Sequence, residues 1–347
     1  MTNYVIQVEE EKDIPCKPIS VFARGFRSFR VLYYKKRISV ELFHTITDGS
    51  GALIFLKSLI AEYLRLQGKQ ISCTEGVLNI DEIPDSSEFE NEFKKAEGSD
   101  DFSTFMDKPS VQLDGNLSAL NITRVIHFEM SCTKLKEISK RYGGTITAYI
   151  LAVMFLAARD SISRKEGLIN MQVPVNMRKF NGSKTLRNYS MYFNTGMDLS
   201  EIKEKEELVV LLNAQIKERG SKEMMTQMMC TTGKLIDSLA FVPVFLKNPI
   251  IQLVYGFFSN RIICNTLSNL GVVNVPDEMK DEITKFAMVL VPGRPNRASS
   301  SMATFNDTTV LTLTKNSRES TFEEKILEYL KEDGLEVRTE GSVEYES

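Results

Sequence analysis

Hydrophobic and polar residues alternate in two short segments near the N-terminus. In residues 28–34 the alternation places Phe29, Val31 and Tyr33 on one face, and residues 38–42 repeat it after a polar turn at 35–37. A period of two is typical of a half-buried strand, and two such runs joined by a short polar turn predict a β-hairpin.

The spacing of hydrophobic residues changes directly after this hairpin. Leu53, Leu56, Ile60 and Leu64 recur at intervals of three and four, which predicts an amphipathic helix that ends near Gly68. Residues 48–51 lie between hairpin and helix and are rich in glycine and in helix-capping side chains. We expect a turn at this junction.

The rest of the chain interleaves apolar runs with charged amphipathic segments. Residues 81–115 are acidic and polar and predict a linker, so we place an N-terminal lobe at 1–115 and a C-terminal lobe at 116–347. Helices are expected at 133–142, 145–158 and 201–219, and strands at 124–130, 168–175, 188–199, 262–268, 286–291, 298–305 and 309–314. This order predicts an α/β or mixed α+β protein with two sheets.

The bulk composition excludes several classes of protein. The 347 residues are 42% hydrophobic and 26% charged, and the net charge of −3 comes from interspersed residues of both signs, which argues against a nucleic-acid binder. Five widely spaced cysteines give no zinc-ligand pattern, so no metal site is expected. Without a signal sequence, and with its longest apolar run at 148–158, the chain is expected to be cytoplasmic.

A mostly apolar segment at 239–258 is interrupted by a lysine, an asparagine and a proline. It favours a buried or tunnel-lining helix pair over a membrane-surface role, so membrane contact is not expected.

One of only two histidines, His44, lies at the end of the second hairpin strand, four residues before Asp48. Histidine is the side chain best suited to accept and return a proton near neutral pH, so His44 could be a general base or simply a solvated strand-end residue. Asp48 is equally well explained as a helix N-cap, and Gly49 as the residue that permits the turn.

The other histidine, His127, alternates with Ile126 and Phe128 and is expected on the polar, exposed face of its strand. The chain has no G-x-S-x-G elbow, no phosphate-binding loop, no G-x-G-x-x-G and no H-E-x-x-H. Serine hydrolysis, nucleotide hydrolysis, dinucleotide redox chemistry and zinc proteolysis therefore lose support.

The run from His44 to Gly49 resembles the H-x-x-x-D-G signature of a superfamily that includes chloramphenicol acetyltransferase, condensation domains, plant acyltransferases, wax ester synthases and alcohol acetyltransferases. Three further segments resemble motifs of these proteins in the same order, at 147–152 (TAYILA), 173–178 (VPVNMR) and 267–271 (LSNLG). The likeness spans about residues 15–340 and is closest to bacterial alcohol-acetyltransferase-like proteins.

This resemblance implies a two-lobed chloramphenicol-acetyltransferase-like fold, in which each lobe is a sheet with flanking helices and His44 lies in a solvent channel between them. His44 would take the proton of an acceptor alcohol or amine as it attacks an acyl thioester, with no acyl-enzyme. Asp48 would pair with Arg178 and, with Gly49, support the site. Ser268, Asn269 and Asn176 would contact the oxyanion or substrate, although a strand-end turn explains Ser268 and Asn269 equally well.

The resemblance also implies the co-substrate and partners. The donor would be acyl-coenzyme A, with a carrier-protein thioester as an alternative, and no tightly bound cofactor is expected. Two departures matter: Phe43 stands where many condensation domains have a second histidine, and members usually carry a further strand and helix before the hairpin. A catalytically degenerate binding or scaffold protein is the alternative function.

Overall fold

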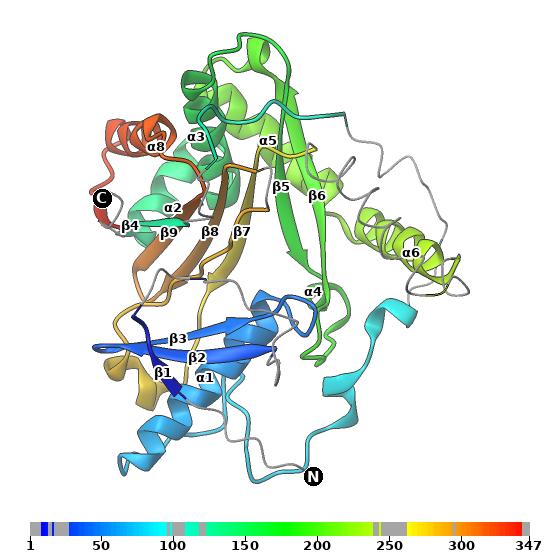
Figure 1. Ribbon diagram of the computed structural model, residues 1–347, viewed down its shortest axis with the longest axis vertical. Helices are drawn as coiled ribbons and strands as arrows, with labels where there is room; N and C mark the ends of the chain where they lie inside the picture. Colours follow the sequence, from blue (N-terminus) through cyan, green and yellow to red (C-terminus); the bar gives the residue numbers. More distant parts are fainter. Residues whose placement is uncertain are drawn as a thin grey trace. The chain divides into compact units, whose positions relative to one another are not determined.

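The computed structural model describes residues 8–12, 16, 28–95, 98, 108–117, 123–238, 243, 262–293 and 296–341 (Figure 1). Its contacts divide the chain into two units. Unit 1 comprises residues 1–92, 176–190 and 274–284, and unit 2 comprises residues 93–175, 191–273 and 285–347. The units thus differ from the single boundary expected at residue 115, because residues 176–190 and 274–284 pack with the N-terminal part of the chain.

Unit 1 is built on the predicted hairpin. Its strands are β1 (Val8–Glu10), β2 (Phe29–Tyr34) and β3 (Arg37–Leu42). They form a three-stranded sheet in that order, with β1 parallel and β3 antiparallel to β2. Tyr34 pairs with Arg37 across the turn, as the alternation predicts. The predicted hairpin is confirmed.

The helix after the hairpin is α1 (Gly49–Leu66), and it packs on the sheet through an edge-to-face contact of Phe55 with Phe29, whose ring centroids lie 5.4 Å apart. Gly68 follows the helix at a φ of +88°, the left-handed conformation expected of a glycine that ends a helix. On α1 the buried Lys57 donates to Glu75 O and to Asn274 O, the latter at 3.1 Å. Burial lowers the pKa of Lys57.

The expected linker at 81–115 contains two short 3-10 helices in its described part, η1 (Ser86–Phe89) and η2 (Glu92–Lys95). Further short helices are α4 (Arg178–Asn181), η4 (Leu199–Glu201) and η6 (Asp277–Glu282). Residues 96–97 and 99–107 of the expected linker lie outside the described residues.

Unit 2 contains a seven-stranded sheet in the order β10-β4-β9-β8-β7-β5-β6. Its strands are β4 (Arg124–Ser131), β5 (Leu168–Asn176), β6 (Ser190–Asp198), β7 (Asn265–Val272), β8 (Ala298–Phe305), β9 (Thr308–Lys315) and β10 (Arg338–Gly341). β7 is parallel to β5 and β8, whereas β8, β9, β4 and β10 pair antiparallel. Both sheets together confirm the expected mixed α/β class.

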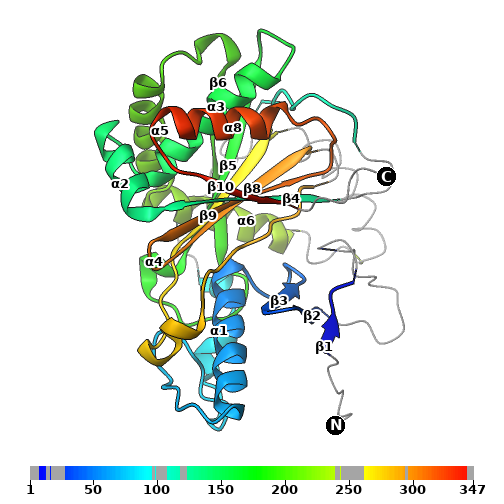
Figure 2. The ribbon, with the colours of Figure 1, turned by 90° about the vertical axis from the view of Figure 1, so that its left-hand side faces the viewer.

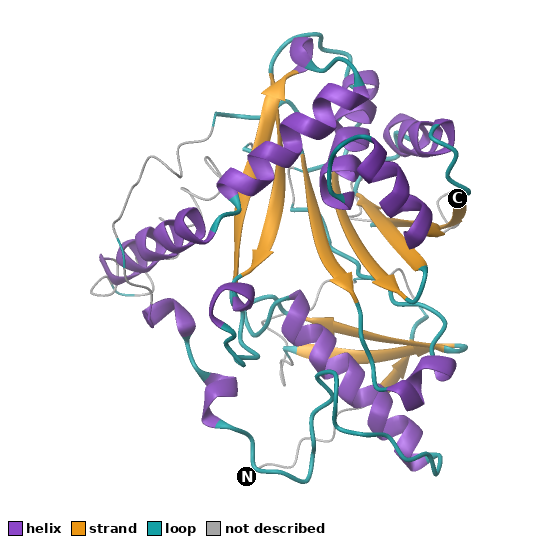
Figure 3. Ribbon diagram, turned by 180° about the vertical axis from the view of Figure 1, so that it is seen from behind, coloured by secondary structure: helices purple, strands orange, loops and turns teal. Residues whose placement is uncertain are grey.

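The larger helices of unit 2 are α2 (Cys132–Arg141), α3 (Ile146–Ser161), α5 (Lys205–Arg219), α6 (Lys222–Ser238) and α8 (Thr321–Glu332). Of these, α2, α3, α5 and α8 gather on one face of the sheet (Figures 2 and 3). The core helix is α3, because every residue from 148 to 158 is buried. A helix that is apolar all round is expected to be buried on all sides.

In the described part of the chain, no single helix is long and apolar enough to span a membrane, although the bent pair of α2 and α3 satisfies the length and composition criteria together. Apart from Pro243, the apolar segment at 239–258 lies outside the described residues.

One predicted strand is wrong. Residues 286–291 form no strand and instead follow the sheet face that carries the hydroxyl side chains of β8 and β9. The Ser301 hydroxyl donates to Met288 O at 2.5 Å, and the Thr314 hydroxyl donates to Leu290 O. Side-chain donors thus replace the backbone partners that a strand would need.

The expectation for His127 also needs correction. The residue is half-buried rather than exposed, and its Nδ1 lies 2.9 Å from the Thr312 hydroxyl on the neighbouring strand β9. The two residues are direct cross-strand partners, which explains the contact.

A buried carboxylate joins three helices of unit 2. Asp333, just after α8, accepts from Lys205 Nζ at 2.7 Å, from the Tyr142 hydroxyl at 2.5 Å and from the Tyr149 hydroxyl at 2.6 Å. Burial alone would raise the pKa of Asp333, but the hydrogen bonds from Lys205 and the two tyrosines outweigh it, so the pKa lies below its ordinary value.

We expect Asp333→Ala to destabilise the protein by ~3–5 kcal/mol, because Lys205 keeps a buried, unpaired charge. Since the folded pKa is lowered, the contribution of Asp333 is complete above its ordinary pKa of 3.8 and is lost as the pH falls through the folded value. Urea unfolding of the parent protein and of Asp333→Ala should show different midpoints near neutral pH, and the difference should become smaller in acid. The exposed Asp277 offers the control, and Asp277→Ala should change stability little.

Candidate active site

The site is built around the turn that follows β3. Phe43 N donates to Ser28 O at 2.8 Å, and Ile46 N donates to Phe43 O at 3.0 Å, so residues 43–46 form a hydrogen-bonded turn tied to the start of β2. His44 lies inside this turn and is exposed. The turn therefore holds the imidazole at the end of the strand and leaves it exposed.

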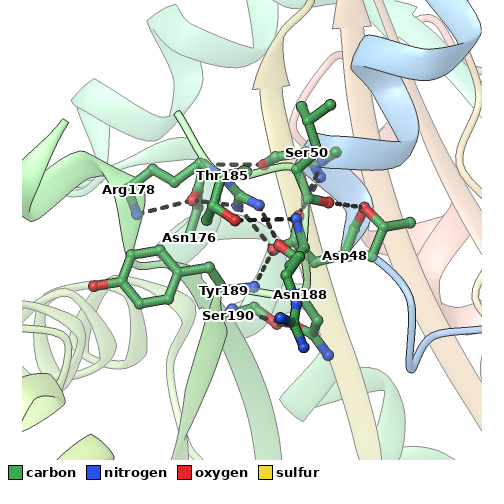
Figure 4. A network of polar contacts seen from close by, with 12 residues as sticks. Asp48, Ser50, Asn176, Arg178, Thr185, Asn188, Tyr189 and Ser190 are labelled. Atoms are coloured by element: carbon green, nitrogen blue, oxygen red, sulfur yellow. Dashed lines mark hydrogen bonds and ion pairs between the residues drawn. The ribbon is translucent and has the colours of Figure 1, made fainter. Parts of the chain in front are cut away.

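Asp48 makes several hydrogen bonds in the site and is only 4% exposed at its side chain. Its Oδ1 accepts from Ser50 N and Gly51 N at 3.0 Å each, which caps α1. Its Oδ2 accepts from Arg178 Nη1 at 2.8 Å and from Tyr189 N at 2.7 Å (Figure 4). The carboxylate is therefore both the N-cap of α1 and one half of an ion pair.

Arg178 lies at the start of α4 and uses its guanidinium to bind the loop that follows. Nε donates to Thr185 O at 2.8 Å, and Nη2 donates to Arg187 O at 2.7 Å. With the ion pair to Asp48, this one side chain fastens the loop at 182–189 to the N-terminus of α1. A planar guanidinium with several donors in fixed geometry is well suited to such a task.

Asn176 is exposed and connects the same elements (Figure 4). Its Nδ2 donates to the Ser50 hydroxyl at 2.9 Å, while its Oδ1 accepts from Arg178 N and Arg178 Nη1 at 3.1 Å each. Both ends of the amide are thus bonded within the protein.

Gly49 does not provide a turn. It is the first residue of α1 and is absent from the glycines with positive φ, because the helix starts directly after its cap at Asp48. Gly51 is instead the glycine that the site requires. A Cβ there would lie 2.1 Å from Thr47 Oγ1 and 2.6 Å from Leu186 O, and these two oxygens are themselves hydrogen-bonded at 2.7 Å.

We expect Gly51→Ala to cost ~1–3 kcal/mol of stability, because the added methyl group must displace backbone at Leu186. Gly233→Ala is the matched control. It is also a helical glycine, but the nearest atom to its added Cβ is Phe93 O at 3.8 Å, so this variant should be as stable as the parent or slightly more stable. Melting temperatures of the two variants measure the difference.

Sequence reasoning missed Asn188. Its Nδ2 lies 3.1 Å from His44 O and 3.2 Å from His44 Nδ1, and its Oδ1 accepts from Ser190 N at 3.3 Å and from the Ser190 hydroxyl at 2.9 Å. The contact joins residues 144 positions apart, so no local spacing pattern signals it.

Ser268 and Asn269 belong to unit 2, where they lie on β7. Asn269 Nδ2 donates to the Thr147 hydroxyl at 3.0 Å, and its Oδ1 accepts from Gly271 N at 2.8 Å. Gly271 has a φ of +75° and lies where the pairing of β7 with β8 shifts register between Asn269 and Val272, so these contacts belong to an irregularity within the strand. Ser268 is half-buried and pairs with Ser301 of β8. The structure brings together the other predicted site residues, all in unit 1: His44, Asp48, Gly49, Asn176 and Arg178.

The model of the alcohol acetyltransferase family matches residues 90–288, which is more than half of the chain. The chain belongs to the alcohol acetyltransferase family. The match includes Arg178 and the segment with Ser268 and Asn269, and it begins after the segment with His44. No curated protein matches the sequence.

Solved structures share the fold at low sequence identity. TRI101 of F. sporotrichioides, complexed with coenzyme A and T-2, is 9% identical, has a TM-score of 0.61, and covers 94% of this chain and 74% of its own. Polyketide synthase associated protein 5 from Mycobacterium tuberculosis is 12% identical, with a TM-score of 0.57 and coverage of 94% and 79%. The TycB3 epimerization domain of tyrocidine synthetase is 11% identical, with a TM-score of 0.52 and coverage of 88% and 71%.

These findings confirm the resemblance that the motifs indicate, and the fold is that of the chloramphenicol-acetyltransferase-like superfamily.

Proposed function

We propose that this alcohol acetyltransferase family member transfers an acyl group from acyl-coenzyme A to an alcohol or amine, with His44 as the general base. The observation that carries the proposal is an exposed imidazole in a turn whose neighbours, Asp48 and Arg178, form a bonded framework at the start of α1. Such a framework presents the ring to solvent in a defined place, as proton transfer requires.

The proposed step is a direct transfer. A nitrogen lone pair of His44 takes the acceptor's proton while the acceptor oxygen or nitrogen attacks the thioester carbonyl carbon. The tetrahedral intermediate then collapses, the carbon–sulfur bond breaks, and the imidazolium returns the proton to the leaving thiolate. Histidine suits both halves because its pKa lies near neutral pH. No acyl-enzyme is formed.

The other residues have supporting roles in this proposal. Asp48 and Arg178 keep the loop at 182–189 and the start of α1 in place, and Gly49 is the first residue of that helix. Asn269 has its amide engaged by Thr147 and Gly271, so the Ser268 hydroxyl is the better candidate donor to the oxyanion, a contact usually worth ~2.7–4 kcal/mol. The amide of Asn176 is likewise engaged, by Ser50 and Arg178, so Asn176 is a weaker candidate for a substrate contact than Ser268.

The donor and location are also part of the proposal. TRI101 was solved with coenzyme A, which supports a coenzyme A thioester as the donor here. The epimerization domain among the similar folds belongs to a synthetase, which keeps a carrier-protein thioester as an alternative donor. Acceptors would be small alcohols or amines, and we place the reaction in the cytoplasm.

A two-part assay tests the function. Thermal unfolding is measured with coenzyme A and with acetyl-coenzyme A, and free thiol is then followed while a panel of primary alcohols and amines is added. We expect both compounds to raise the melting temperature and thiol to appear only when an acceptor is present. A raised melting temperature without thiol release for any acceptor or acyl chain would identify a binding protein in place of the transferase.

A further inference from the structure

The two ring nitrogens of His44 differ in their surroundings. Among the described residues, Asn188 is the side chain hydrogen-bonded to this ring, at 3.2 Å from Nδ1. A general base must offer an unprotonated nitrogen to its substrate, and the hydrogen bond made by one ring nitrogen decides which tautomer is present. The orientation of the Asn188 amide therefore bears directly on what His44 can do.

The amide orientation follows from Ser190. Ser190 supplies two donors on one side of Asn188, its backbone N–H at 3.3 Å and its hydroxyl at 2.9 Å, and both are directed at the amide oxygen. The NH₂ group of Asn188 consequently faces His44, where it lies 3.1 Å from the carbonyl oxygen and 3.2 Å from Nδ1. An amide NH₂ has two hydrogens and no lone pair to offer, so one hydrogen serves each of these atoms.

This geometry makes Nδ1 an acceptor. A neutral imidazole whose Nδ1 accepts a hydrogen bond carries its hydrogen on Nε2. We propose that Asn188 is a positioning residue that holds His44 in the Nε2–H tautomer in the ligand-free protein, so that Nε2, which has no hydrogen-bond partner among the described residues, becomes basic only when the amide leaves Nδ1. The catalytic part of this inference rests on the proposed function, whereas the tautomer does not.

The change of tautomer leaves the charge of the ring unchanged. When the amide withdraws, Nδ1 gains a proton from water and Nε2 loses one to water, and the exposed position of His44 permits this exchange. Nε2 then carries the lone pair that takes the acceptor's proton. Asn188 would thus keep Nε2 a donor until a bound substrate displaces the amide from Nδ1.

Nitrogen-15 NMR tests the tautomer directly, and the chain suits it because His44 and His127 are its only histidines. The substitution His127→Gln removes the second set of ring signals and lies outside the site. In this background, at a pH where His44 is neutral, we expect the ring signals of the Nε2–H form.

The substitution Asn188→Asp should reverse the pattern to Nδ1–H, because a carboxylate only accepts hydrogen bonds. Asn188→Ala should give a mixture of the two tautomers, and Ser190→Ala should weaken the preference for the Nε2–H tautomer. An Nδ1–H ring in the parent, or a pattern unchanged by both Asn188 substitutions, would overturn the inference.

Kinetics tests the catalytic part in the same variants, once their melting temperatures show that they fold. We expect Asn188→Asp to raise kcat severalfold with little change in KM, because the neutral ring already carries its lone pair on Nε2. Its pH profile should move to higher pH by about one unit, since a carboxylate beside His44 favours the imidazolium. A fall in kcat together with a reversed tautomer would refute the resting-state role. If the parent protein itself releases no thiol, the proposed function fails while the NMR result still decides the tautomer.

Discussion

Replacement of His44 by alanine should abolish thiol release from an acyl thioester while the protein keeps its fold. The loss should reach a factor of 10²–10⁴, the usual contribution of a general base. Stability should hardly change, because the side chain is exposed and the hydrogen-bonded partner of its ring, Asn188, keeps its bonds to Ser190. The measurements are kcat/KM for thiol release and the melting temperature.

The second histidine provides the matched control. His127→Ala removes a half-buried ring bonded to Thr312 in unit 2, so it should cost some stability and leave the rate of transfer unchanged. His44→Gln adds a further comparison, since it keeps hydrogen-bonding capacity without a titratable nitrogen. Turnover retained in both His44 variants would remove His44 from the mechanism.

Breaking the ion pair between Asp48 and Arg178 should have a large effect on stability. The two side chains are only 4% and 11% exposed, and Asp48→Asn leaves a guanidinium charge without its partner in a poorly hydrated place. Such a loss typically costs ~3–5 kcal/mol. Activity should fall with it, because the loop at 182–189 loses its attachment to α1.

A double-mutant cycle measures this coupling. Asp48→Asn, Arg178→Gln and the double variant are compared by urea unfolding, and we expect the double variant to be less destabilised than the sum of the single variants. Lys280→Ala breaks the exposed pair with Asp277 and should change stability little. Single variants of Asp48 and Arg178 as mild as Lys280→Ala would show that the pair does not hold the site.

Local patterns in the sequence predicted the first part of the site well. The alternation around Val31 and the helical spacing from Leu53 to Leu64 identified the hairpin and α1, since both elements bury one face and follow a simple period. The junction between them was less well predicted. A capping aspartate and two glycines suggested a turn, whereas Asp48 starts the helix at once.

Contacts between distant segments could not be predicted in the same way. Asn188 reaches His44 across 144 residues, and Asn176 reaches Ser50 across 126, and neither contact has a spacing that a single sequence can reveal. The segment at 286–291 has the composition of a strand, but hydroxyl groups of the sheet bind its carbonyls, so no strand pairing forms there. Such outcomes depend on tertiary context, which overrides local propensity.

The most direct test of the central claim, acyl transfer to an acceptor, is mass-spectrometric detection of the product. The protein is incubated with acetyl-coenzyme A and a panel of alcohols and amines, and the ester or amide is quantified beside the free thiol. The account predicts equal amounts of product and thiol, an unmodified protein mass, and no product with His44→Ala. Thiol release without any acylated acceptor, or an acylated protein, would contradict it.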